Sequence, residues 1–212
     1  MSDHPPVSSP VMSKHRLEML SDGVFAVVMT LLVLELKPEL PVHSNDEAVA
    51  KVLRELVRPL LSYVFAFVLS GIFWSLHHRK FALLRHTDGP HTAFTLAFLF
   101  GITLLPLSVS IYLKALSSGL AQAVYFGNFA FIALALLTSW LYAKHAGLAD
   151  LASSPQIAAA LTRRMTAFSA LGLIACASSW LGKTWLLYLM LPVILWLRHR
   201  RGPAPSSKPA SP

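Results

Sequence analysis

Charged residues and cysteine are what this sequence has least of. Asp, Glu, Lys and Arg make up 13% of its 212 residues, against roughly 25% in an ordinary soluble domain. Hydrophobic residues account for 55%, so too few charges remain to coat a soluble surface. Cys176 is the single cysteine, which excludes an internal disulfide and a cysteine-rich metal site. The 18 basic residues outnumber the 10 acidic ones, but they lie between apolar runs, where orientation in a membrane explains them better than a nucleic-acid partner does.

Several functional motifs are also missing from the chain. No TVGYG-like segment is present, which excludes an ordinary carbonyl-filter channel, and no arginine-rich helix resembles a voltage sensor. The Walker A, GxGxxG, HExxH and GxSxG patterns are absent. No run gathers nucleophiles or carboxylates at one depth, as a membrane enzyme would need. We therefore expect neither an enzyme nor a bound cofactor.

Long apolar runs decide the fold class. A membrane helix needs about 20 predominantly apolar residues, and the chain has six apolar segments, the last two of them short: 17–36, 57–78, 91–113, 121–143, 165–182 and 184–198. The sequence thus predicts an all-α, polytopic membrane protein with six transmembrane helices per chain. The first run lacks a small-x-small cleavage site after it, so we interpret it as a retained helix rather than a signal peptide.

The ends of the chain and the loop at 37–56 differ in composition from the membrane runs. Residues 1–13 and 202–212 are rich in Pro and Ser, which predicts disordered tails on either side of a membrane domain at 14–201. Within the 37–56 loop, the stretch DEAVAKVLRELVRPL has helical spacing. It predicts a short amphipathic helix on the outer face.

The distribution of Lys and Arg predicts the orientation. Six helices place both termini on one side, which then collects twelve of the 18 basic residues. The other side holds six: Lys37, Lys51, Arg54, Arg58, Lys114 and Lys183. Because cytoplasmic loops carry the excess of Lys and Arg, we expect both termini in the cytoplasm and the protein in the inner, or plasma, membrane.

Few ionisable residues lie inside the apolar runs, and three of them are expected to meet. Asp22 lies about one turn inside the first segment, Arg16 precedes it, and His77 lies at the cytoplasmic end of the second segment. Intramembrane ionisable residues are costly and suggest function with a partner nearby. Two interpretations stay open: a gate or proton-sensitive latch, or a salt-bridge and hydrogen-bond network that orders packed helices.

The first segment also carries a stripe of apolar and small residues. At about 100° per residue, the stripe falls within an arc of about 80°, and Asp22 points away from it. Its members are Gly23, Val27, Thr30, Leu31 and Leu34. By composition alone, such a stripe is typical of helix packing, and a pore lining is the sharper alternative.

The opening of the first segment resembles a known family. The sequence RLEMLSDGVFAVVMTLLVLELK is similar to the signature first helix of the transmembrane protein 175 family, the endolysosomal-type potassium channels and their prokaryotic relatives, whose motif reads R-x-x-x-F-S-D. The second-segment sequence WSLHHRKF and the third-segment LLP also resemble that family. The resemblance covers about residues 14–200.

The resemblance implies a function and a set of site residues. Prokaryotic members are homotetramers in the bilayer, and four first helices line a central pore without a separate filter loop. The matching positions for the apolar constriction and selectivity are Val27, Thr30, Leu31 and Leu34. The matching positions for the motif that holds the helices together are Arg16, Ser21 and Asp22, with Trp74 and His77 as partners. Leu20 replaces the motif's Phe, and Thr95 stands near an Asn of the relatives, which puts gating and exact selectivity in question.

We therefore expect a potassium-favouring cation channel that has a hydrophobic constriction on its first helix, with potassium as the permeant ion. Glu35, just beyond Leu34, is either one of a ring of carboxylates that attracts cations or an interfacial residue paired with Lys37. A rival of another class is a secondary transporter or proton pathway that uses Asp22 and His77 as relays. That rival predicts a substrate-sized polar cavity at mid-membrane.

Overall fold

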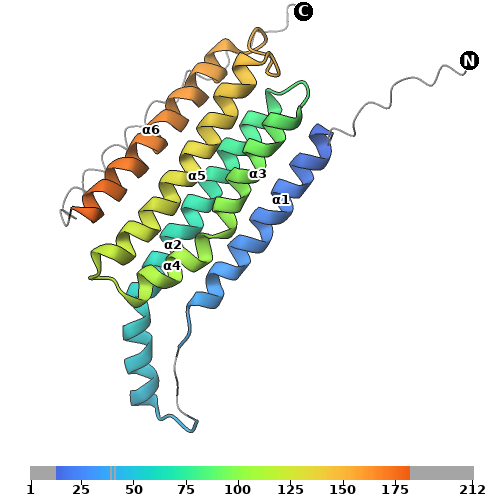
Figure 1. Cartoon of the computed structure of the whole chain (residues 1–212). Coiled ribbons are helices and arrows are strands. Elements are labelled where there is room, and N and C mark those ends of the chain that lie inside the picture. The colour runs from blue at the N-terminus through green and yellow to red at the C-terminus, as the bar shows by residue number, and fades with distance from the viewer. Residues whose placement is uncertain (1–12, 39, 41, 182–212) are drawn as a thin grey trace, which may run out of the picture.

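The computed structural model describes residues 13–38, 40 and 42–181, and these residues form helices and no strand (Figure 1). A 3₁₀ turn, η1, directly extends the first helix. The elements in chain order are α1 (Lys14–Leu31), η1 (Leu32–Glu35), α2 (Asp46–Ala82), α3 (Gly89–Thr103), α4 (Leu105–Lys114), α5 (Gly119–His145) and α6 (Pro155–Trp180).

Five helical spans in the described residues are long and apolar enough to cross a membrane. They are Lys14–Leu34, Asp46–Ala82, Gly89–Lys114, Gly119–His145 and Pro155–Trp180. Five of the six segments expected from sequence overlap them. The sixth, 184–198, lies outside the described residues, as do the expected tails apart from Ser13.

Three boundaries differ from the sequence prediction. The stretch expected as a separate amphipathic helix is instead continuous with α2, which runs unbroken for 37 residues through Pro59. The fifth span begins at Pro155, ten residues before the predicted start at 165, because the helix continues past the apolar run through Arg163 and Arg164. The third segment is two helices, α3 and α4, which meet at Leu104.

Pro106 explains the break between α3 and α4. It lies in the first turn of α4, where the missing amide hydrogen of proline costs no helical bond, but it cannot continue a preceding helix. Near the break, Gly101 lets α3 approach α5 closely. A Cβ atom at Gly101 would lie 2.7 Å from Ile132 and 2.8 Å from Phe131.

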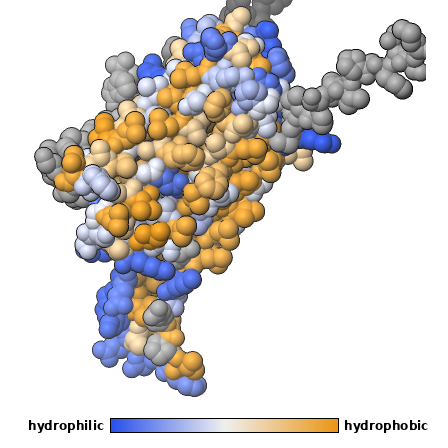
Figure 2. Space-filling model, in the orientation of Figure 1, coloured by the Kyte–Doolittle hydropathy of each residue, from blue (hydrophilic) through white to orange (hydrophobic). Residues whose placement is uncertain are grey.

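The helices form an antiparallel bundle with α1 at one edge (Figure 1). A run of phenylalanine rings fills the centre: Phe73 packs within 6.4 Å of Phe98, 5.4 Å of Phe129 and 6.0 Å of Phe168, measured between ring centroids. The face of the bundle drawn in Figure 2 is largely apolar. A protein that is apolar both inside and outside is suited to lipid rather than water.

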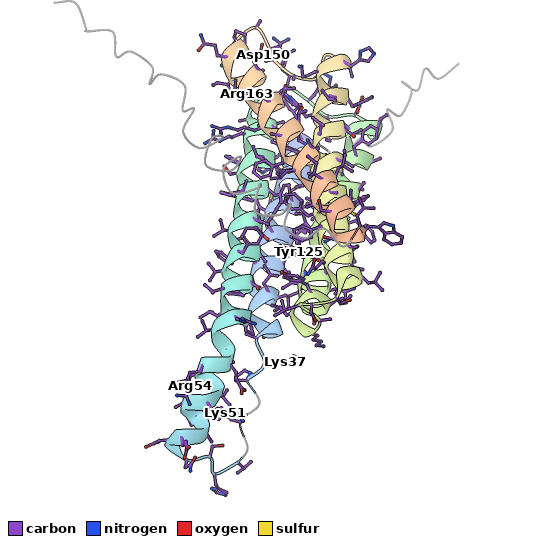
Figure 3. The ribbon with its side chains drawn as sticks, turned by 90° about the vertical axis from the view of Figure 1, so that its left-hand side faces the viewer. Lys37, Lys51, Arg54, Tyr125, Asp150 and Arg163 are labelled. Atoms are coloured by element: carbon purple, nitrogen blue, oxygen red, sulfur yellow. The ribbon has the colours of Figure 1, made fainter. Side chains whose placement is uncertain are left out.

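Charged residues gather at the two ends of the molecule. The first part of α2 projects beyond the bundle and carries Lys51 and Arg54, whereas Asp150 and Arg163 lie at the opposite end (Figure 3). The opposite end is also where two loops are joined. Leu84 and Ala149 form an isolated bridge, and Arg85 Nη2 lies 3.0 Å from Asp150 Oδ1.

Candidate functional site: the uncovered face of α1 and its contacts with α2

One side of α1 is buried against the rest of the chain. Leu17, Ser21, Phe25 and Val28 are buried and recur every three or four residues, and Leu32 of η1 continues the row. This spacing places them on one helix face. The face fixes how α1 rotates about its axis and therefore which residues point away from the bundle.

The other side of α1 is apolar and uncovered. Val27, Leu31 and Leu34 are 56%, 42% and 61% exposed, and Thr30 is exposed as well. At Gly23, no atom lies within 4 Å of where a Cβ would be. The stripe expected from sequence thus lies on the side of α1 that the other described residues leave uncovered.

Thr30 is the one hydroxyl on this face. Its Oγ1 lies 2.7 Å from the Val27 carbonyl oxygen and 3.2 Å from that of Ala26, and its hydrogen is donated there. With the hydrogen used in the backbone, the oxygen offers its lone pairs to the exposed side. The side chain of Glu35, expected one residue beyond Leu34, lies outside the described residues.

Three contacts between one turn of α1 and one turn of α2 hold the start of α1. Trp74 Nε1 donates to Asp22 Oδ1 at 2.8 Å, and Ser21 Oγ lies 3.5 Å from His77 Nε2 while donating to the Leu17 carbonyl. A third contact was not expected from sequence: His78 Nδ1 lies 3.8 Å from Glu18 Oε1.

The spacing of these residues could have revealed the third contact. Glu18 precedes Asp22 by four residues, and His78 follows Trp74 by four, so each pair shares one helix face. Because α1 and α2 run antiparallel, a contact between Asp22 and Trp74 brings Glu18 and His78 together one turn away. The His78 ring also stacks on Trp74, with centroids 5.6 Å apart and an interplanar angle of 20°.

His77 is buried among aromatic rings. It is 2% exposed, lies nearly parallel to Phe98 at a centroid distance of 5.1 Å, and is 4.6 Å from the Phe81 ring. This packing fixes the ring beside Ser21. An orienting role for His77 in helix packing follows directly from these contacts.

The structure places Arg16 apart from the other members of the expected cluster. Arg16 is exposed, and its backbone amide donates to the Ser13 hydroxyl that caps α1. Among the described residues, no hydrogen bond or ion pair joins its guanidinium to Asp22 or His77. Within one chain, the partner of Asp22 is Trp74 instead.

Besides Ser21 and His77, a second group of buried polar side chains lies at the same end of the bundle, farther from α1. Sequence reasoning missed it. Lys80 is fully buried and donates from Nζ to Ser139 Oγ at 2.9 Å. Ser139 Oγ in turn lies 3.5 Å from Thr95 Oγ1, so α2, α3 and α5 meet at this group. The signal was present: Lys80 follows Phe73 and His77 at helical spacing, which places it on the buried face of α2.

Asp88, in the loop before α3, caps that helix and links it to α5. Its Oδ1 accepts from the His91 amide at 2.8 Å, and its Oδ2 accepts from the Tyr142 hydroxyl at 2.6 Å. Burial by itself raises the pKa of Asp88, but the hydrogen bonds from Tyr142 and His91 outweigh it and leave the pKa below its ordinary value. The carboxylate is thus held in its charged form.

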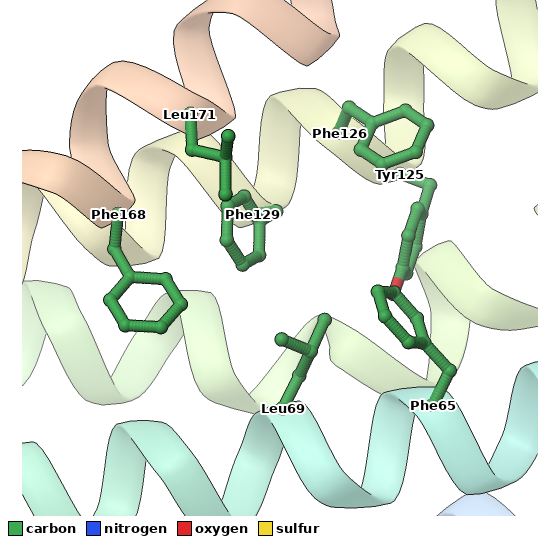
Figure 4. Close-up of a pocket in the computed structure, with 7 residues that line it drawn as sticks. All are labelled: Phe65, Leu69, Tyr125, Phe126, Phe129, Phe168 and Leu171. Atoms are coloured by element: carbon green, nitrogen blue, oxygen red, sulfur yellow. The ribbon is translucent and has the colours of Figure 1, made fainter. Parts of the chain in front are cut away.

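The cavity drawn in Figure 4 does not suit a polar substrate. It lies between α2, α5 and α6, is about as large as one water molecule, and is lined by Phe65, Leu69, Tyr125, Phe126, Phe129, Phe168 and Leu171. It is therefore not the substrate-sized polar cavity that the transporter alternative predicts. Among the described residues, no group of three His, Cys, Asp or Glu side chains is arranged to hold a metal ion.

Comparisons with known proteins bear on both the fold and the site. A family model described as the endosomal/lysosomal potassium channel TMEM175 matches residues 16–106, the part that contains α1, its contacts with α2, and α3. A potassium channel from Chryseobacterium sp. (strain P1-3) is 36% identical over 97 residues, which is 46% of this chain and 47% of that protein.

Two of the matches come from Chamaesiphon minutus. A potassium channel from strain ATCC 27169 / PCC 6605 is 36% identical over 140 residues, covering 64% of this chain and 66% of that protein. The crystal structure of a lysosomal potassium-selective channel TMEM175 homologue from this organism superposes with a TM-score of 0.70 at 29% identity, and covers 89% of this chain and 98% of that one. The sequence matches thus span 47% and 66% of the two curated relatives' lengths, whereas the structural match spans nearly the whole fold.

Proposed function

We propose that this chain, a multi-pass membrane protein that belongs to the TMEM175 family through residues 16–106, forms a potassium-favouring cation channel. The observation that carries the proposal is the uncovered apolar face of α1. Val27, Leu31 and Leu34 lie on the side of the helix that its own chain leaves open. The family model that matches residues 16–106 includes this helix, and the chain is similar to relatives named as potassium channels.

The proposed channel is a homotetramer with four copies of α1 around a central axis. In this arrangement, α1 occupies the edge of each subunit bundle, as it does in Figure 1, and its uncovered face points to the axis. Segment 184–198 is the sixth transmembrane helix, which returns the C-terminus to the side of the N-terminus. The Lys and Arg distribution then places both termini, with tails at 1–13 and 202–212, in the cytoplasm beneath the inner membrane.

The proposed barrier to ions is a hydrophobic constriction. Rings of Val27, Leu31 and Leu34 offer no hydrogen bond to water, so a narrow passage between them empties and a hydrated ion meets a desolvation barrier until the rings move apart. Thr30, between them, contributes four hydroxyl oxygens with lone pairs directed to the passage. Because no carbonyl cage replaces the hydration shell, we expect only modest preference for potassium over sodium.

The contacts between α1 and α2 set the position of that constriction. Asp22 with Trp74, and Ser21 with His77, tie α1 to α2 about two and a half to three turns before Leu31. In the proposed channel, Arg16 lies on the exposed side of the same end, where its guanidinium is available to a neighbouring subunit. Glu35 at the outer end, as one of four carboxylates, concentrates cations near the entrance.

Recording from the purified full-length chain in planar bilayers tests the proposal. With potassium on one side and sodium on the other, the reversal potential should shift toward the potassium equilibrium potential. Protein-free bilayers treated with the same detergent are the control. Absence of current above that control, or a reversal potential set by anions, would contradict a cation channel.

A further inference from the structure

A row of apolar residues runs along the side of α2 that faces away from its own chain. Successive members are separated by four, three, four, three and four residues: Leu53, Val57, Leu60, Val64, Phe67 and Gly71. We call this row the α2 seam. The five side chains are 61%, 52%, 44%, 47% and 40% exposed, and no atom lies within 4 Å of a Cβ at Gly71.

Lipid does not account for the whole seam. Between Arg58 and Arg79, α2 contains no Asp, Glu, Lys or Arg, and that stretch is about the length needed to cross the hydrocarbon layer. Leu53 and Val57 lie before it, on the part of α2 that projects beyond the bundle among charged residues (Figures 2 and 3). These two apolar side chains are therefore outside the lipid and remain exposed beside the described residues of their own chain.

The spacing of the seam identifies what kind of surface fits it. Alternating steps of three and four residues give a mean period of about 3.5, which keeps an apolar row facing a second helix over several turns. Helices that meet in this way cross at about 20°. Gly71 adds a position without a side chain, where another backbone can come close.

Charge on the projecting part of α2 favours a partner with the same mixture of signs. Glu47 and Arg54 lie along one edge of the seam, and Lys51 and Glu55 lie farther round the helix, so both signs occur within about two turns. A second copy of the chain carries the same set. It can therefore offer charges opposite to those beside the seam, which neither lipid nor a uniformly charged partner does.

The seam also continues into the site described above. The next positions at the same spacing are Trp74 and His78, both of which contact α1 residues and remain partly exposed. The seam thus leads from the projecting end of α2 to the contacts that hold α1.

We infer that the α2 seam is the surface with which each subunit contacts a neighbouring copy of this chain. The inference rests on the proposed tetramer and names the surface that builds it. In a ring with four-fold symmetry, a patch cannot meet its own equivalent, so the seam contacts a different surface of the neighbour. Leu53 and Val57 make that contact outside the lipid.

Photocrosslinking of the full-length chain tests the seam. A benzophenone side chain introduced as Leu53→p-benzoylphenylalanine reacts with whatever covers that position. Lys51→p-benzoylphenylalanine is the matched control, because Lys51 lies on the same exposed stretch but off the seam. Illumination should give covalent dimers and higher species up to four chains from the Leu53 variant, and at least tenfold less from the Lys51 variant.

The mass of the unmodified protein separates the two proposals. A native mass of four chains with no crosslinked dimer from the Leu53 variant, or with equal yields from both variants, would overturn the seam and leave the tetramer standing. A native mass of one chain would contradict the tetramer itself, and the seam with it. Val57→Lys gives a second reading: it should reduce the tetramer fraction, and an unchanged fraction would overturn the seam.

Discussion

Trp74→Phe isolates the hydrogen bond that ties α1 to α2. The substitution keeps an aromatic ring stacked on His78 but removes the Nε1 hydrogen that Asp22 accepts at 2.8 Å. A hydrogen bond to a charged group contributes about 1.5–3 kcal/mol. Both residues are exposed in the single chain, where pairs contribute less, so we expect a loss of about 1 kcal/mol.

The loss is measurable as a shift in thermal unfolding. For a chain of this size, 1 kcal/mol corresponds to roughly 2–4 °C in Tm, read from the tryptophan fluorescence of purified protein in detergent. Trp180→Phe is the matched control, because Trp180 is 77% exposed and no hydrogen bond of its indole is found among the described residues. We expect the control to change Tm by less than about 1 °C, as surface substitutions usually do.

A double-mutant cycle with Asp22→Ala shows whether the bond itself is responsible. Ala has no oxygen acceptor, so each single variant removes the bond. If the bond couples the two residues, the double variant should lose less than the sum of the singles by at least 0.5 kcal/mol, a typical lower bound for residues in contact. Additive losses would refute the contact as the source of the effect. In the proposed channel, the same variants should also alter open probability, because α1 is less firmly held.

Three further predictions concern the proposed pore and the loops. Leu31→Asn places an amide in the apolar constriction, so current in bilayers should rise and the preference for potassium over sodium should weaken; unchanged conduction in an assembled variant would place the constriction elsewhere. Leu31 is 42% exposed and the adjacent Leu32 is 0% exposed. In a Cys176→Ser background, a charged water-soluble thiol reagent should therefore modify Leu31→Cys much faster than Leu32→Cys. Equal rates would mean that α1 does not present this face to water. Arg85 holds the pKa of Asp150 below its ordinary value, so the ion pair should stabilise the fold above the ordinary pKa of about 4 and cease to do so as pH falls through the lowered value. Asp150→Asn should therefore lower Tm at neutral pH but not at pH values below that transition, and a deficit independent of pH would exclude the ion pair as its cause.

The number and approximate positions of the described membrane spans could be predicted from sequence, because membrane helices are recognised by the length and apolarity of their segments. The boundaries were less accessible. The start of α6 at Pro155 was missed because polar residues such as Arg163 end the apolar run while the backbone continues as helix. The unbroken α2 was missed because the charged, amphipathic stretch at 46–60 differs in composition from the apolar run that follows, while the backbone continues as one helix through Pro59.

Part of the candidate site could likewise be predicted from sequence, and part could not. Periodicity alone placed Val27, Leu31 and Leu34 on one face of α1, but only packing shows that this face is uncovered. Pairing between α1 and α2 depends on the axial register of two helices, which periodicity does not contain. Reasoning from the residues alone therefore joined Asp22 to Arg16 or His77, and only the family resemblance named Trp74, to which the register in the single chain brings Asp22.

Pro59 lies where the projecting part of α2 meets the part that crosses the lipid. Proline cannot donate to the carbonyl four residues earlier, so the backbone ladder of α2 lacks a bond at this level. Bending α2 therefore costs least there, and the turns that carry Trp74, His77 and His78 lie well beyond it. The projecting end can therefore change its angle to the membrane portion of α2, while that portion and its contacts with α1 stay in place.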